Sequence, residues 1–300
     1  MQPCLAAQRP NTRLAFLAGF TMIAITAVQF VAARFSLRAD LTAVDIAGLR
    51  FAGAGLVFLP VLWWSGLGKL KALGWRRAVI LAGLIGLPYP IIINWGLTYA
   101  PAAHAAALCP ASIVFFSSLL GRFAFGETIT TRRLLGIALI IGGLLLFILP
   151  SLSGTPGILF GDLLFAGSGV MFATYGLVVR HWGVESITAT AAVSLLSCLP
   201  LPLLYLVASS GLAVASAPEI AAQLVIQGLL AGAAAIFLYT YAVRQLGPQI
   251  AALFLPCVPV ATAFTGMVVL AEVPGLPQFI AMLIMTAGMV LPVLLKRGEN

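Results

Sequence analysis

Residues 78–121 form one continuous stretch without a single Lys, Arg, Asp or Glu. As one α-helix this stretch would be about 66 Å long, roughly twice the thickness of a bilayer core, because each residue adds about 1.5 Å. The chain must therefore turn inside it. Tyr99-Ala100-Pro101 is the natural place, because helices usually end before a proline. The stretch predicts two membrane-spanning helices, 78–98 and 102–121, joined by a tight turn.

The rest of the chain has the same character. Hydrophobic residues make up 62% of the sequence and charged residues 8%, whereas a soluble domain carries about 25% charged residues. The first apolar segment, 14–33, exceeds the roughly 7–15 residues of a cleaved signal peptide, so we expect a membrane helix there. An all-α integral membrane protein with ten transmembrane helices is predicted, at 14–33, 46–66, 78–98, 102–121, 134–150, 160–179, 187–208, 220–243, 249–270 and 276–295.

The distribution of Lys and Arg predicts the orientation in the membrane. Of the 16 bases, 13 fall on the side that holds both termini; the others are Arg34 and Arg38 in one loop and Arg50 within the second span. Because cytoplasmic loops are rich in Lys and Arg, we expect both termini in the cytoplasm of a bacterial-type inner membrane. The bases form no continuous patch, so the net charge of +8 does not indicate a nucleic-acid partner.

Two similar stretches indicate an internal repeat. YAPAAHAAALCP at 99–110 is matched by QLGPQIAALFLP at 245–256, and the same offset of 145–146 residues aligns Pro110 with Pro256 and Glu127 with Glu272. Each half has five helices, an odd number, so the second half enters the membrane upside down. The prediction is two inverted five-helix repeats, 1–152 and 153–300, within one membrane unit, which is a common plan of secondary transporters.

Several short motifs occur in a consistent order over essentially the whole chain: LRF at 49–51, a proline midway along helices four and nine, GET at 126–128 and AEV at 271–273. In this order they resemble the EamA family of the drug/metabolite transporter superfamily. The resemblance implies a ten-helix carrier that exports small metabolites by alternating access. Bacterial members of the family include YddG-type aromatic amino-acid exporters.

One departure from the superfamily concerns coupling. Its small multidrug members use a glutamate in the first helix for proton exchange, and Gln29 is the corresponding polar residue here. Glutamine cannot titrate, so proton antiport through such a carboxylate is in doubt and facilitated diffusion stays open. We expect no cofactor, and we expect the protein to work as a monomer in the lipid bilayer.

Two basic side chains lie within predicted spans. Arg50 is interpreted in two ways: its guanidinium reaches the outer interface with Asp45 nearby, or it faces the cavity and anchors a substrate carboxylate. His104 could sense pH or relay protons; alternatively it is a hydrogen-bonded histidine close to the outer boundary. Ionisable groups inside a membrane are functional candidates by default.

Uncharged polar and aromatic residues recur at equivalent positions of the two halves. Gln29 aligns with Tyr175, and Trp95 aligns with Tyr241, each at an offset of 146. Such residues could line a cavity for a small amphipathic or aromatic metabolite; the alternative is an aromatic belt at the membrane interface. The candidate substrate-binding residues are Gln29, Arg50, Asn94, Trp95, Tyr99, His104, Tyr175, Tyr239 and Tyr241.

Prolines inside predicted spans bend helices because they remove a backbone hydrogen bond. Pro110 and Pro256 are hinge candidates for the alternate opening of helices four and nine, and the alternative is a static kink that serves packing. The four cysteines have no CxxC spacing, so no metal site is expected.

Competing functions make different demands on the sequence. An intramembrane serine protease would need a GxSxG motif and a prenyl-transferring enzyme would need aspartate clusters; neither is present, so we expect no enzyme and no catalytic residue. The preferred function is export of amino acids, especially aromatic or hydrophobic ones. The alternatives are a carrier of another metabolite or drug in the same superfamily, and a channel or receptor-type membrane protein.

Overall fold

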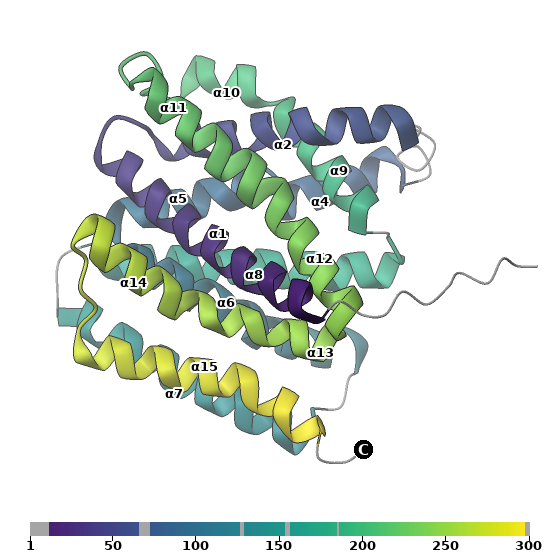
Figure 1. Ribbon diagram of the computed structural model, residues 1–300, viewed down its shortest axis with the longest axis vertical. Coiled ribbons are helices and arrows are strands. Elements are labelled where there is room, and N and C mark those ends of the chain that lie inside the picture. Colours follow the sequence, from purple (N-terminus) through teal and green to yellow (C-terminus); the bar gives the residue numbers. More distant parts are fainter. Residues whose placement is uncertain (1–11, 66–72, 127–128, 154–156, 185, 298–300) are drawn as a thin grey trace, which may run out of the picture.

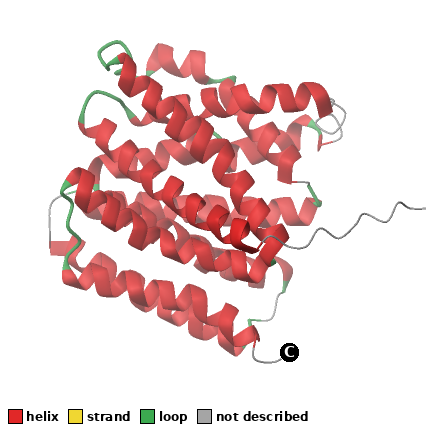
Figure 2. Ribbon diagram, in the orientation of Figure 1, coloured by secondary structure: helices red, strands yellow, loops and turns green. Residues whose placement is uncertain are grey.

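The computed structural model describes residues 12–65, 73–126, 129–153, 157–184 and 186–297, and within these ranges every regular element is a helix (Figure 2). Ten helical segments of the described chain are long and apolar enough to cross a membrane. Their positions coincide with the ten spans predicted from the sequence, which confirms an all-α membrane architecture.

The first five spans are built from six helices. They are α1 (Thr12–Arg38), α2 (Ala43–Ser65), the consecutive pair α4 (Trp75–Ile85) and α5 (Pro88–Tyr99), α6 (Ala102–Phe125) and α7 (Thr131–Ser153). The third span is interrupted where Pro88 begins α5, a position that suits proline because its missing N–H would have no partner within the helix. The break is held by Ser197 Oγ, which accepts a 3.1 Å hydrogen bond from Leu87 N–H.

The last five spans contain more interruptions. They are α8 (Ile158–Trp182), α9 (Ser186–Cys198) with α10 (Leu201–Val207), α11 (Ala217–Gln223) with the π-helix η1 (Leu224–Ala234) and α12 (Ala235–Leu246), α13 (Pro248–Ala251) with the 3₁₀-helix η2 (Ala252–Cys257) and α14 (Val258–Leu270), and α15 (Leu276–Arg297). The turn predicted at 99–101 is confirmed, because α5 ends at Tyr99 and α6 begins at Ala102.

The two candidate hinge prolines have different surroundings. Pro110 lies inside the uninterrupted helix α6, whereas Pro256 lies in the 3₁₀ segment η2. The fourth span is thus a single helix, and the ninth span consists of the three consecutive helices α13, η2 and α14. A role of either proline as a moving hinge stays a prediction.

The helices of the two halves are interleaved. The most extensive contacts pair α7 with α15, α6 with α8 and α2 with η1, so each pair takes one helix from either half (Figure 1). Glycines permit close crossings: a Cβ built on Gly53 would lie 2.7 Å from the Cα of Gly228, and one on Gly136 would lie 2.6 Å from the carbonyl oxygen of Gly288. Backbones therefore touch within these pairs, as small residues allow in membrane proteins.

The bundle has two chemically different ends. The described acidic residues all lie at the end formed by the connections after α1, α5, α10 and α14, on the left in Figure 1, and we call this the carboxylate end. At the opposite end the helical part of the chain both begins and finishes, and we call this the termini end. Most of the described arginines lie there. Glu127 lies outside the described residues.

Candidate functional site

A network of charges closes the carboxylate end. Glu272, which follows α14, accepts hydrogen bonds from Arg34 Nε at 3.0 Å, from Arg38 and from the backbone N–H of Ala102 at 3.0 Å. Arg34 also donates to the carbonyl of Leu97. The side chain of Glu272 is 10% exposed. This carboxylate therefore ties α1 and the start of α6 to the connection between α14 and α15.

The residue before Glu272 has an unusual backbone conformation. Ala271 caps α14 with φ of 54°, in the left-handed region that disfavours residues other than glycine. The corresponding position after α6 is Gly126, with φ of 64°. The two helices thus end in the same way, and the second uses the more strained residue.

His104 is buried beside a buried aspartate. Its Nδ1 lies 2.7 Å from Oδ1 of Asp162 on α8, and the two side chains are 3% and 0% exposed. Ser151 on α7 donates to the other oxygen of Asp162 at 2.8 Å. The second ring nitrogen of His104 lies 3.0 Å from Nε2 of Gln278 on α15. Four helices, α6, α7, α8 and α15, therefore meet at this polar chain.

A cavity of about 370 Å³ joins the two networks. Its walls include Arg34, Arg38 and Glu272 of the first network and His104 and Gln278 of the second. The ring of His104 also packs edge-on against Phe147, with the ring centroids 4.7 Å apart. The cavity gives a polar approach to the buried His104.

Asp45 secures another connection at the same end. Its carboxylate accepts hydrogen bonds from the backbone N–H and hydroxyl of Thr42, both at 2.8 Å, from Ser210 Oγ at 2.7 Å and from the backbone N–H of Gly211 at 2.9 Å. Asp45 is fully buried. All its described hydrogen-bond partners belong to the two connecting loops and none is Arg50.

Arg50 lies farther along α2, in an aromatic region between the halves. Tyr89 of α5 is its neighbour, and no described residue forms a salt bridge or hydrogen bond with its guanidinium. The ring of Tyr89 lies 5.7 Å from that of Phe172, and Phe172 lies 6.0 Å from Tyr175. We call Arg50, Tyr89, Phe172 and Tyr175 the Arg50 cluster. It places one cation near Tyr89, from which the aromatic rings continue through Phe172 to Tyr175.

The other predicted residues are dispersed. Asn94 is buried on α5, Gln29 receives a hydrogen bond at its carbonyl from Gln227 at 3.0 Å, and Tyr239 packs against the main apolar core. Trp95 is 46% exposed and Tyr99 is 41% exposed, and both pack edge-on against Phe160. Tyr99 also lines the cavity at the carboxylate end. Tyr241 is half-buried on α12.

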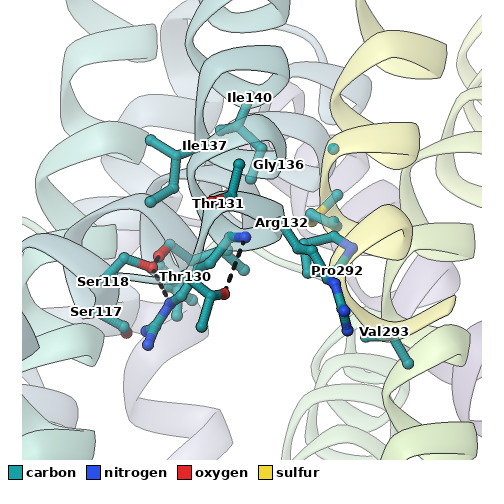
Figure 3. A pocket seen from close by; sticks show the side chains of 15 residues that line it. Ser117, Ser118, Thr130, Thr131, Arg132, Gly136, Ile137, Ile140, Pro292 and Val293 are labelled. Carbon is teal, nitrogen blue, oxygen red and sulfur yellow. Dashed lines mark hydrogen bonds between the residues drawn. The ribbon is translucent and has the colours of Figure 1, made fainter. Parts of the chain in front are cut away.

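The termini end has a larger hollow of about 890 Å³ between α6, α7 and α15 (Figure 3). Its outer part carries Ser117, Ser118, Thr130 and Arg132, and its inner part is apolar. Arg133 Nε donates to Ser118 Oγ at 3.0 Å. None of the nine predicted substrate-binding residues lines this hollow.

Sequence reasoning missed three members of the buried polar chain. Asp162 and Gln278 lie near the starts of predicted spans and Ser151 directly follows one, and none of the three was a candidate site residue. A signal was available for Asp162 alone, because a carboxylate within a membrane segment suggests a buried partner. His104 was the titratable side chain nearest to it in depth. Within the described residues, no cluster of three or more His, Cys, Asp or Glu could hold a metal ion.

Comparison with known proteins identifies the family. The EamA-like transporter family matches the chain twice, at residues 13–149 and 159–294. The chain belongs to this family. It is therefore a membrane transporter of the drug/metabolite type, and the resemblance noted in the sequence is confirmed.

Relatives of the EamA protein also carry transporter names. A protein of Archaeoglobus fulgidus named as an uncharacterized transporter is 28% identical over 294 residues, covering 94% of this chain and 97% of its own. A probable terminal-alkyne amino-acid exporter of Streptantibioticus cattleyicolor is 28% identical, covering 84% and 85%. A probable amino-acid metabolite efflux pump of Escherichia coli is 31% identical over 140 residues, covering 41% and 46%.

A solved crystal structure shares the fold. It superposes with a TM-score of 0.62 at 21% identity and covers 95% of this chain and 99% of its own. At this identity the likeness concerns the arrangement of the helices alone.

Proposed function

We propose that this EamA protein exports amino acids, with aromatic or hydrophobic side chains preferred, by alternating access through a central cavity between two inverted halves. The double match of the family domain, at an offset equal to that of the repeated motifs, supports the repeat. Two relatives whose names refer to amino-acid export support the substrate class.

The observation that carries the proposal is the Arg50 cluster. A guanidinium inside a membrane span is costly unless it has a partner, and the described residues supply no carboxylate for Arg50. A substrate carboxylate fits this place, because the planar guanidinium can bind it through two hydrogen bonds. The rings of Tyr89, Phe172 and Tyr175 supply apolar faces for the substrate side chain.

The orientation is part of the proposal. Arginines predominate at the termini end and carboxylates at the other end, so the termini end is the cytoplasmic side of a bacterial-type inner membrane by the positive-inside rule. The carboxylate end is then the outer face. In this proposal the hydrogen bonds of Glu272 and Asp45 hold the outer exit closed.

Counterflow in proteoliposomes tests the function. Vesicles that hold the purified protein and unlabelled phenylalanine should take up labelled phenylalanine in a saturable way, with and without a proton gradient. A panel of amino acids defines the preference. Flux that is linear in concentration and is not stimulated by internal substrate would indicate a channel and refute the carrier.

Variants of Arg50 test the anchor. Arg50→Gln should lower counterflow by about 10- to 100-fold, because a hydrogen bond to a charged group contributes about 1.5–3 kcal/mol. Arg50→Lys keeps the charge but loses the planar pair of donors and should also lose transport. The matched control is Arg76→Gln at the termini end, which should transport normally. Unchanged transport by Arg50→Lys, or equal competition by phenethylamine, which lacks the carboxylate, contradicts the anchor.

A further inference from the structure

The protonation state of His104 follows from its neighbours. The backbone N–H of Gly275 donates at 2.8 Å to Oε1 of Gln278, which fixes the orientation of that amide. The amide nitrogen of Gln278 then faces Nε2 of His104 at 3.0 Å, and an amide N–H₂ can only donate. His104 Nε2 must therefore accept, so the single ring proton lies on Nδ1 and is donated to Asp162.

This arrangement is one proton short of neutrality. A neutral imidazole beside an ionised Asp162 leaves one buried negative charge, which accepts one hydrogen bond from Ser151 and one from His104 Nδ1. Burial makes an unneutralised charge costly. A second proton on His104 would complete an ion pair with Asp162 and remove that net charge.

The same proton would break the contact with Gln278. Protonated Nε2–H would face the amide N–H₂, two donors with no acceptor between them. Rotation of the amide would offer an oxygen to His104 but would turn N–H₂ toward the N–H of Gly275. In either arrangement the start of α15 loses one of the two hydrogen bonds that Gln278 makes.

Gln278 is close to the charges that close the carboxylate end. It shares the cavity of about 370 Å³ with Arg34, Arg38 and Glu272, and with Tyr99 from α5. Glu272 lies in the connection that runs from α14 into α15. Release of Gln278 therefore loosens the segment whose carboxylate ties α1 to α6. The cavity also supplies a polar route by which a proton reaches Nε2.

We propose that His104 is the proton-binding site of this transporter, and that a proton bound at Nε2 releases Gln278 and favours opening of the carboxylate end. The inference rests on the proposed function, in which this end is a transport gate. It assigns a coupling site to a chain whose first helix has glutamine where related exchangers carry a titratable group.

Nitrogen-15 NMR observes the proton directly. The chain contains two histidines, so a His181→Gln variant labelled at histidine reports His104 alone. We expect Nδ1–H and an unprotonated Nε2 at about pH 8, and a doubly protonated ring at about pH 5. An Nε2 that stays unprotonated over this range overturns the proposal.

Spin-label distances observe the opening. Labels at Val273 and at Phe123, which are 76% and 79% exposed, report the distance from the α14–α15 connection to the far end of α6. In a background with the native cysteines replaced, a longer distance should become at least fivefold more populated between about pH 8 and about pH 5. Gln278→Leu should show the longer distance at both pH values, and His104→Gln should lose the response.

The matched control is His181→Gln, at the termini end, which should keep the full pH response. A pH response that persists in His104→Gln, or a closed distribution in Gln278→Leu at both pH values, overturns the proposal. Neither experiment uses a substrate. Loss of counterflow activity would therefore refute the transport proposal alone, and pH-insensitive distances in a protein active in counterflow would refute this inference alone.

Discussion

The two ends of the bundle use their charges differently. At the carboxylate end, Glu272 accepts hydrogen bonds from arginines of α1 and from the first backbone N–H of α6, and buried Asp45 accepts them from two connecting loops. At the termini end, arginines lie over aromatic rings: Arg76 is 5.6 Å from the ring centroid of Trp75, and Arg180 is 5.1 Å from that of Phe125. The first arrangement joins elements distant in sequence, and the second makes solvated contacts that join fewer elements.

This difference indicates where the molecule can be opened by a small change. A buried carboxylate with several donors leaves all of them without a partner when it is lost. An exposed arginine on an aromatic ring contributes about 0.5–1 kcal/mol and can be lost without consequence. The following substitutions test that contrast.

The largest effect is expected for Asp45→Asn. In the native protein the carboxylate accepts hydrogen bonds from Thr42, Ser210 and Gly211. The asparagine amide keeps one acceptor oxygen, and its N–H₂ group faces some of these donors. Hydrogen bonds to charged groups contribute about 1.5–3 kcal/mol each, so we expect a loss of about 3 kcal/mol. Thermal unfolding in detergent measures it. Asp40→Asn, at an exposed neighbouring site, is the control and should leave the midpoint unchanged.

Glu272→Gln should open the carboxylate end rather than unfold the protein. It leaves Arg34 and Arg38 without their carboxylate, at a cost of about 1.5–3 kcal/mol. A cysteine at Ala103, which is 6% exposed and lines the cavity, reports the opening. Its labelling by an impermeant maleimide should accelerate about tenfold, since about 1.4 kcal/mol corresponds to a factor of ten. Equal labelling rates with Glu and Gln would mean that Glu272 does not seal this end.

Backbone substitutions should have opposite signs at the two ends. Ala271→Gly relieves a left-handed conformation and should stabilise the protein by about 0.5–1 kcal/mol, whereas Gly126→Ala introduces one and should destabilise it by about 1–2 kcal/mol. Both changes are read as shifts of the thermal midpoint. Two shifts of the same sign would show that the left-handed caps do not control stability.

The smallest effect is expected for Arg76→Gln. Trp75 beneath it is 72% exposed, so the contact contributes about 0.5–1 kcal/mol at most. We expect a thermal midpoint within experimental error of the native protein. A loss as large as that of Asp45→Asn would remove the contrast between the ends.

Much of the fold follows from the sequence for simple reasons. The membrane requires about 20 apolar residues per helix, and this length fixed ten spans and placed the turn at 99–101. Helix interruptions were harder to predict. Pro88 marks one clearly, but the π-helix η1, which packs against α2, has no proline to mark it.

The polar sites were predictable only in part. Arg50 and His104 stand out because they are charged or titratable residues in apolar segments. Asp162 is 58 positions from His104, and Gln278 is 174 positions away, so no local pattern connects them. Trp95 and Phe160 likewise meet only because α5 packs on α8. Side-chain partners across helices depend on helix rotation, which apolar runs leave undetermined.

The interleaved pairing of helices has a consequence for biosynthesis. α7 ends at Ser153, but its main partner α15 begins only at Leu276. At about 5–20 residues per second, ribosomes need on the order of ten seconds to make the intervening chain. During that interval the glycine-containing face of α7 has lipid or insertion machinery as its neighbour. The nascent protein therefore remains incompletely packed until its last helix enters the bilayer.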